Sequence, residues 1–214
     1  MATSRQELLW DKEEGFYRYK SSGRRVSDYQ MLRLIHREQS DYAKSIDYLT
    51  DRLLAGTLNY QDYQNQVARE IKDAHVSMMR LGRGGRDATY GIHYLDVGNE
   101  LRQNQYPALR QLFQDLSDGK LSPAQLRARL KNYVKSSKVS YEQARKTRLA
   151  ETGIRYARRF LGAVDARNCP DCVRYAQAGV QLSDSLPLPG QDCQCRGNCR
   201  CSIRFARFRF ELEG

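Results

Sequence analysis

The stretch NCPDCVRYAQAGVQLSDSLPLPGQDCQCRGNCRCSIRF, residues 168–205, contains every cysteine of the 214-residue chain. Two cysteines in a C-x2-C pair place their sulfurs on one turn of the chain, where both can bind one metal ion. A second group of cysteines after a loop completes the four ligands of a tetrahedral zinc site. The sequence therefore predicts a zinc site drawn from six residues: Cys169, Cys172, Cys193, Cys195, Cys199 and Cys201.

The composition around these cysteines favours a metal as the source of folding free energy. A segment of about 45 residues with few large apolar side chains cannot build its own core. Zinc can supply about 10 kcal/mol or more to such a piece. Four ligands suffice for one ion, and the two C-x-C pairs are expected to be awkward joint ligands. The favoured set is Cys169, Cys172, Cys195 and Cys199, with Cys193 and Cys201 in reserve or sharing a second zinc.

Two other interpretations of the cysteines remain open. A disulfide knot would suit an oxidising compartment, but the N-terminal MATSRQELLWDKEEG has no apolar core of a secretory signal. A catalytic cysteine is the weakest interpretation, because the histidines His36, His75 and His93 all lie in the first half of the chain. A closed thiolate site also leaves no open coordination position for a reaction.

The first 121 residues have the pattern of a helical domain. Residues 1–26 are polar with scattered aromatic residues, and we expect an extended arm there. Apolar residues then recur at helical spacing over 28–55, 60–81 and 96–118, with Pro107 predicting a kink or a new start. A glycine-rich loop is expected at 81–91. No apolar run reaches about 18 residues, so no membrane span is expected.

The charge of the chain is concentrated in one segment. The net charge is +11, and residues 123–162 contain eleven Lys and Arg against two Glu. Ser122 and Pro123 begin a helix that is either continuous or broken near Ser140. One row of basic side chains could contact the phosphates of double-stranded DNA without reading its bases, or be a solvated helix face. The row is Arg127, Lys131, Lys135, Lys138, Arg145, Arg148, Arg155 and Arg159.

The last segment changes in composition at Ala163 and ends in residues that favour strands. In CSIRFARFRFEL, residues 201–212, Phe208, Phe210 and Leu212 share one face, and a bend is expected near Ala206. The predicted fold is mainly α, with long amphipathic helices, a small C-terminal zinc knuckle and a short β tail. The predicted units are an arm (1–26), a helical domain (27–121), a basic helical segment (122–162) and a cysteine-rich zinc module (163–214).

Several of these motifs together are similar to a known family. RLAETGIRYARRFLGAVDARNCPDC (148–172), followed by AGV (178–180), LPLPG (186–190) and NCRC (198–201), resembles the C-terminal module of tailed-phage head morphogenesis proteins, the Mu F-like minor head proteins. The resemblance covers roughly residues 140–204. The family often has H-P-x-C-R-C, whereas Arg196, Gly197 and Asn198 precede Cys199 here. Cys195 or Cys193 could replace the missing histidine as a ligand.

The resemblance implies a structural role in a virion. Minor head proteins of this family associate with the portal vertex and assist capsid assembly and DNA packaging or delivery. It implies a place in the head or at the head–tail junction, and in the host cytoplasm during assembly. The expected partners are the portal protein, a major capsid or scaffolding protein and double-stranded DNA, with an oligomeric state in the virion and no membrane.

Two further functions were weighed against this one. A stand-alone, zinc-containing, nucleic-acid-binding regulator would have the same composition, but no base-reading module is recognisable. An enzyme such as a nuclease would need paired carboxylates with a histidine or an open metal site. Asp165, Asp171 and Asp192 surround the cysteines but are more typical of loop and capping residues. We therefore expect a protein that is not an enzyme.

Overall fold

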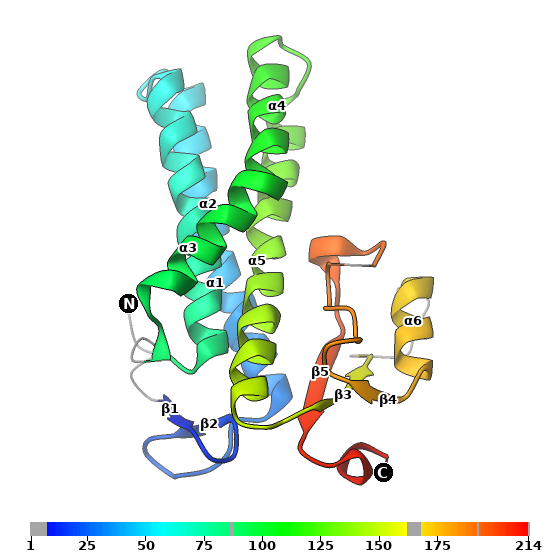
Figure 1. Ribbon diagram of the computed structural model, residues 1–214. Coiled ribbons are helices and arrows are strands. Elements are labelled where there is room, and N and C mark those ends of the chain that lie inside the picture. Colours follow the sequence, from blue (N-terminus) through cyan, green and yellow to red (C-terminus); the bar gives the residue numbers. More distant parts are fainter. Residues whose placement is uncertain (1–7, 86–87, 162–167, 192, 214) are drawn as a thin grey trace.

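The computed structural model describes residues 8–85, 88–161, 168–191 and 193–213, and it is mainly helical, as the sequence predicts (Figure 1). Its helices are α1 (Asp28–Leu54), α2 (Tyr60–Arg83), α3 (Gly91–Glu100), the π-helical turn η2 (Leu101–Gln105), α4 (Tyr106–Ser117), α5 (Pro123–Glu151) and α6 (Pro170–Gln177). Its strands are β1 (Leu8–Asp11), β2 (Phe16–Tyr19), β3 (Tyr156–Phe160), β4 (Val180–Leu182) and β5 (Ser202–Ala206). Two 3-10 turns, η3 (Arg196–Asn198) and η4 (Arg209–Leu212), complete the described fold.

The long helices α1, α2 and α5 pack with α4 into one bundle (Figure 1). Each long helix begins at a side chain that satisfies its free backbone N–H groups. Ser27 and Ser122 form capping boxes with Gln30 and Gln125, and Asn59 accepts a hydrogen bond from Asp62 N–H. The apolar stripes of these helices meet in a core that includes fully buried residues of every long helix: Ile46, Tyr63, Val67, Ile71, Leu126, Leu130 and Val134. Residues 122–151 are therefore part of this bundle and not a separate segment.

Helix α5 resolves the two alternatives for the basic segment. It is one unbroken helix, and Ser140 lies buried inside it, hydrogen-bonded to His75 at 2.8 Å. The expectation that helical structure continues to residue 162 is wrong. The helix ends at Glu151, and Gly153 adopts the left-handed conformation with φ of 79°. Arg159 consequently lies on strand β3, and Arg155 lies in the connection before it.

The glycine-rich stretch contains a helix–helix contact as well as a loop. Helix α2 continues through Arg83, so the expected loop begins at Gly84, whose φ is 98°. A Cβ added at Gly82 would lie 2.2 Å from the backbone oxygen of Tyr141 on α5. The missing side chain thus lets α2 and α5 approach closely at this point.

The helix predicted at 96–118 is divided as its proline suggests. Helix α3 passes through the π turn η2 into α4, with Pro107 in the first turn of α4. Because proline has no N–H, it is tolerated in a first turn and disrupts a helix interior. The predicted kink or restart at this proline is confirmed.

Residues 8–19 form a β-hairpin, so the prediction of an extended arm is wrong for this part of it. The rings of Trp10 and Tyr17 make an edge-to-face contact at 5.0 Å, and the Tyr17 hydroxyl donates to Leu81 O at 2.8 Å. A Cβ at Gly84 would lie 2.6 Å from the Trp10 ring. The aromatic residues that suggested an arm therefore attach the hairpin to the C-terminal end of α2. Residues 1–7 lie outside the described part.

The C-terminal module packs beside α5, with α6 on the side away from that helix (Figure 1). Its three-stranded antiparallel sheet has the order β4-β3-β5, with Arg159 opposite Ile203. Strand β5 ends at Ala206, where a bend was expected, but residues Arg209–Leu212 form a 3-10 turn and not a strand. Phe208 and Phe210 stack on one another at 5.6 Å and remain exposed. No helix of the described residues is long and apolar enough to span a lipid bilayer.

Candidate metal centre

Three short segments of the C-terminal module bring the cysteines together. Cys169 caps α6 and Cys172 lies in its first turn, with Pro170 between them at the first helical position. The second pair precedes η3, and the third pair follows η3 and leads into β5. These second and third pairs are Cys193 with Cys195 and Cys199 with Cys201. The chain therefore returns to α6 after the proline-containing loop, as the spacing predicts.

The sulfur atoms of the cluster lie at distances that suit one coordination shell. The sulfur of Cys195 is 3.5 Å from those of Cys169 and Cys172, and 3.4 Å from that of Cys193. The sulfur of Cys172 is 3.7 Å from that of Cys199. Zinc–sulfur bonds of about 2.3 Å in a tetrahedron place sulfurs about 3.8 Å apart. The clustered cysteines could therefore hold a metal ion such as zinc.

The same distances are too long for a disulfide knot, the alternative that the sequence left open. A disulfide bond joins its sulfurs at about 2.05 Å. All six cysteines are free thiols in this structure, and four of them are buried. Groups of three or more possible ligand atoms from His, Cys, Asp or Glu, all within 4.8 Å of one another, occur in the described part of the chain, and every such group consists of cysteines. An all-sulfur donor set favours zinc over calcium or magnesium, which prefer oxygen.

The grouping differs from the favoured set in one member. The four sulfurs that lie mutually within 4.8 Å belong to Cys169, Cys172, Cys193 and Cys195. Cys193, placed in reserve, thus takes the position expected for Cys199, which joins Cys172 and Cys201 in a second group. The expectation that a C-x-C pair is awkward within one set is wrong, because Cys193 and Cys195 converge on the same point.

Without a cation, the thiols of Cys172, Cys193 and Cys195 would stay protonated at neutral pH. Burial raises the pKa of Cys172 to about 12 and also raises that of Cys195. The hydrogen bond to Cys199, together with burial, raises the pKa of Cys193 to about 12. Burial opposes ionisation of Cys169 as well, but hydrogen bonds from Cys172 outweigh it and lower its pKa. A bound cation reverses this balance, because a coordinating thiol is deprotonated outright.

Two buried cations lie against the cluster. The Lys138 ammonium, on α5, donates to Cys199 O at 3.1 Å and to Cys201 O at 2.7 Å. The Arg159 guanidinium donates to Pro187 O and lies 3.9 Å from the Cys172 sulfur. Their exposed fractions are 4% and 1%. A divalent ion with four thiolates has a net charge of −2, so these two side chains fit such a site electrostatically.

Three further cations of α5 also bind the C-terminal module. Lys135 donates to Asn198 Oδ1 at 2.8 Å, Arg145 donates to Ile203 O at 3.0 Å, and Lys146 donates to Asp184 O at 3.3 Å. Three members of the row that was predicted to contact DNA, Lys135, Lys138 and Arg145, therefore attach the module to α5. Phosphate contacts are excluded for Lys138 and Arg159 as placed here, because both are buried.

Three other members of the predicted row also have partners within the bundle. Arg127 donates to Asp51 at 2.6 Å, and Lys131 pairs with Asp47 at 3.0 Å, which joins α5 to α1. Arg148 pairs with Glu151, the glutamate of the family-like motif, at 3.0 Å. Arg155 is exposed in the connection between α5 and β3. Phosphate contact stays a prediction for the exposed members of the row.

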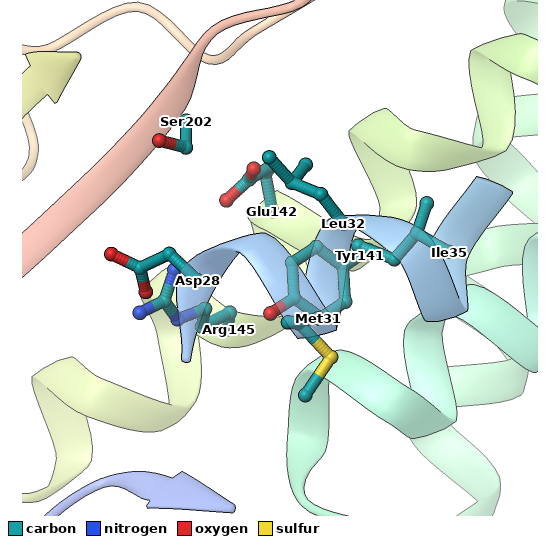
Figure 2. A pocket seen from close by; sticks show the side chains of 8 residues that line it. All are labelled: Asp28, Met31, Leu32, Ile35, Tyr141, Glu142, Arg145 and Ser202. Carbon is teal, nitrogen blue, oxygen red and sulfur yellow. The ribbon is translucent and has the colours of Figure 1, made fainter. Parts of the chain in front are cut away.

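Glu142 interrupts the basic row and faces the junction of α1, α5 and β5. Figure 2 shows its carboxylate next to the Leu32 side chain of α1, on the side that faces Ser202 of β5. Its exposed fraction is 1%, and burial raises its pKa, while Arg145 and Lys138 oppose that rise. The cavity there measures about 10 Å³, enough for one water molecule and too small for an organic ligand. This junction is an attachment between the bundle and the module.

A second, larger cleft lies between α2, α3 and α5, and sequence reasoning missed it. It measures about 230 Å³ and is lined by His93, Asp96 and Glu100 from α3, with Ser140 and Gln143 from α5. The spacing H-x2-D-x3-E was the available signal, because residues three and seven apart share a helical face. Among the described residues, the possible ligand atoms of His93, Asp96 and Glu100 do not all lie within 4.8 Å of one another, so these side chains do not form a metal-binding group in this structure.

Other residues of the family-like motif have structural positions. Gly179 adopts φ of 72° between α6 and β4, and Pro187 accepts the hydrogen bond from Arg159. Asp171, expected to be a loop or capping residue, accepts a hydrogen bond from Gln194 N–H at 3.0 Å. Asp165, Arg167 and Asp192 lie outside the described residues.

Comparisons of the chain with protein-family models, with curated proteins and with solved structures give no match.

Proposed function

We propose that this chain is a structural protein of a tailed-phage head, located at the portal vertex or the head–tail junction. A zinc ion, bound by Cys169, Cys172, Cys193 and Cys195, folds its C-terminal module. The helical bundle carries that module as one rigid unit and presents it to the portal protein. The role is organisational during capsid assembly and DNA packaging, and the chain performs no reaction.

One observation carries this proposal. The cysteines of the family-like motif, distant in sequence, converge into one cluster; of its two buried cations, Arg159 belongs to the motif and Lys138 precedes it on α5. Glu151 of the motif binds Arg83 at 2.8 Å and so ties α5 to α2. The motif thus contains the candidate metal ligands, the buried Arg159 beside them and the glutamate that ties α5 to α2.

Contact with packaged DNA is proposed at a different surface from the α5 row. Arg155, Arg207 and Arg209 are exposed around β3 and the C-terminal turn, next to the exposed pair Phe208 and Phe210. We expect sequence-independent binding whose logarithm falls steeply with the logarithm of salt concentration. Replacing these three arginines by alanine should reduce that slope by about 1 per lost phosphate contact. A slope unchanged by the triple variant would place the contact elsewhere.

The portal proposal is tested first by the gene's surroundings and then by co-expression. A portal gene should lie immediately upstream, with scaffold or capsid genes downstream. When the chain is co-expressed with that portal protein, the two should co-elute on size exclusion, and Cys172→Ser should abolish co-elution. The matched control is Gln194→Ala, an exposed residue between the cysteines. Failure of the unmodified chain to bind the portal would contradict the proposal.

The second candidate, a stand-alone zinc-containing regulator, predicts a different outcome. Such a chain would bind duplex DNA with a sequence preference and would elute without a portal protein. Competition between random and selected duplexes at one salt concentration distinguishes the two functions, since phosphate contacts alone have no sequence information.

A further inference from the structure

The six sulfurs of the cluster form two overlapping groups. The first contains Cys169, Cys172, Cys193 and Cys195, and one ion bound there would satisfy the proposed function. The second contains Cys172 with Cys199 and Cys201, whose sulfurs also lie within 4.8 Å of one another. Cys172 belongs to both groups. Its sulfur is 3.5 Å from that of Cys195 on one side and 3.7 Å from that of Cys199 on the other.

The backbone around the second group directs its sulfurs inward. Cys199 has φ of −63° and ψ of 122°, and alternate side chains of an extended chain point to the same side. Cys201, two residues later, therefore shares a face with Cys199. The Lys138 ammonium binds the carbonyls of both residues and holds this segment in place. Both thiols are buried, with exposed fractions of 4% and 1%.

Cys193 is the candidate for a fourth ligand of the second group: its sulfur is within 4.8 Å of that of Cys172 but not of all three sulfurs of the group, so a bound ion would have to draw it closer. The Cys193 thiol is hydrogen-bonded to Cys199, in addition to its 3.4 Å contact with Cys195. Cys193 thus contacts one sulfur of each group, as Cys172 does. Six thiolates with two of them shared give eight metal–sulfur bonds, which completes two tetrahedra.

We propose that the cluster binds two zinc ions, the second held by Cys172, Cys193, Cys199 and Cys201, with Cys172 and Cys193 shared between the ions. This rests on the metal-folded module proposed above. Two divalent ions and six thiolates have a net charge of −2, which Lys138 and Arg159 balance. Binding moves no electrons, and each thiol that was protonated releases its proton to solvent.

The first test is the stoichiometry of the full chain, purified without chelator, by native mass spectrometry and elemental analysis. Two zinc ions per chain are expected. One ion per chain overturns the second site and leaves the metal-folded module and the portal proposal standing. No metal overturns the zinc part of both proposals, whereas failed portal binding by a chain with two zincs overturns the portal role alone.

The second test detects the shared sulfurs. In the chain loaded with ¹¹³Cd, two cadmium resonances split by mutual coupling are expected, because a shared thiolate connects the two nuclei. Two resonances without coupling, or one resonance, would overturn the sharing. Cys201→Ser should reduce the content from two ions to one, and Gln194→Ala should leave it at two. The zinc stoichiometry and the cadmium–cadmium coupling are both measured on the unmodified chain. The second site can therefore be tested even if a variant fails to fold.

Discussion

The helical bundle and the C-terminal module are stabilised by different means. The bundle buries a continuous set of large apolar side chains from α1, α2, α4 and α5. In the described part of the module, the buried apolar cluster consists of Ala157, Leu186, Leu188 and Ile203, beside the buried thiols. Apolar burial contributes about 1.5–3 kcal/mol per large side chain, so the bundle can fold by hydrophobic burial alone. The module buries far less apolar surface, so we expect its fold to depend on a bound ion.

Metal removal should produce the largest loss of stability, and this loss should be confined to the C-terminal module. A chelator, or Cys172→Ser, is expected to remove about 10 kcal/mol of folding free energy from the module. Hydrogen exchange should then show loss of protection at Arg158 and Ile203 in the sheet, while Ile71 in α2 keeps its protection. Equal protection of the sheet with and without chelator would mean that the module folds without metal.

The boundary between the two regions is the next point to test. Lys138→Met should destabilise the module by about 3–5 kcal/mol, because it leaves two buried carbonyls without a donor and removes a buried charge from its partners. The stability of the module can be measured by urea unfolding, with the release of metal to a chromogenic chelator as the signal. Lys135→Met is the matched control on the same helix, since its hydrogen bond to Asn198 is exposed and should contribute less than about 1 kcal/mol. Equal effects of both variants would contradict a special role for the buried ammonium.

The same boundary shows what could be predicted from the sequence. The helices over 28–55 and 60–81, the kink at Pro107 and the convergence of the cysteines follow from local signals: apolar spacing, caps and C-x2-C spacing. Whether a basic side chain is buried against the module or exposed to solvent cannot be predicted from its neighbours in the sequence. Lys138 and Lys135 belong to one basic row, and only the packing of the module on α5 buries the first and leaves the second exposed.

Non-local pairing explains the other differences from the sequence predictions. The aromatic residues at 10 and 17 suggested an arm, and their contacts with residues 81 and 84 of a distant helix fix a hairpin. Residues 156–160 continue a helical pattern, but pairing with both β4 and β5 makes them a strand. Tertiary pairing overrides weak local preference in both places.

Within the bundle, close packing makes a smaller but sharp prediction. Gly82→Ala should cost about 2–3 kcal/mol, because its methyl group would collide with the backbone of α5 at Tyr141. Gly98→Ala, in α3, is the matched control, since nothing lies within 4 Å of its added Cβ and alanine favours helix by about 0.5–1 kcal/mol. Thermal unfolding measures both variants. Bound metal should stay unchanged in both, and a loss of metal in Gly82→Ala would mean that the two regions do not fold separately.

Acid should weaken the bundle through His75, which lies fully buried between α2 and α5. Burial lowers its pKa from 6.5 to about 4. Because the folded state favours the neutral ring, this stabilisation is complete above pH 6.5 and is lost as the pH falls toward 4. Between pH 7 and pH 5 the loss should be about 2 kcal/mol.

The measurement must separate this loss from protonation of the thiolates in the module. His75→Gln and the unmodified chain have the same six cysteines, so the difference between their stability–pH slopes isolates the imidazole. The slope should become much shallower in His75→Gln and only slightly shallower in His36→Gln, because burial lowers the pKa of His75 to about 4 and also lowers, to a smaller extent, that of His36 on α1. If all three slopes coincide, the acid sensitivity belongs to the metal centre, and the bundle is insensitive to pH in this range.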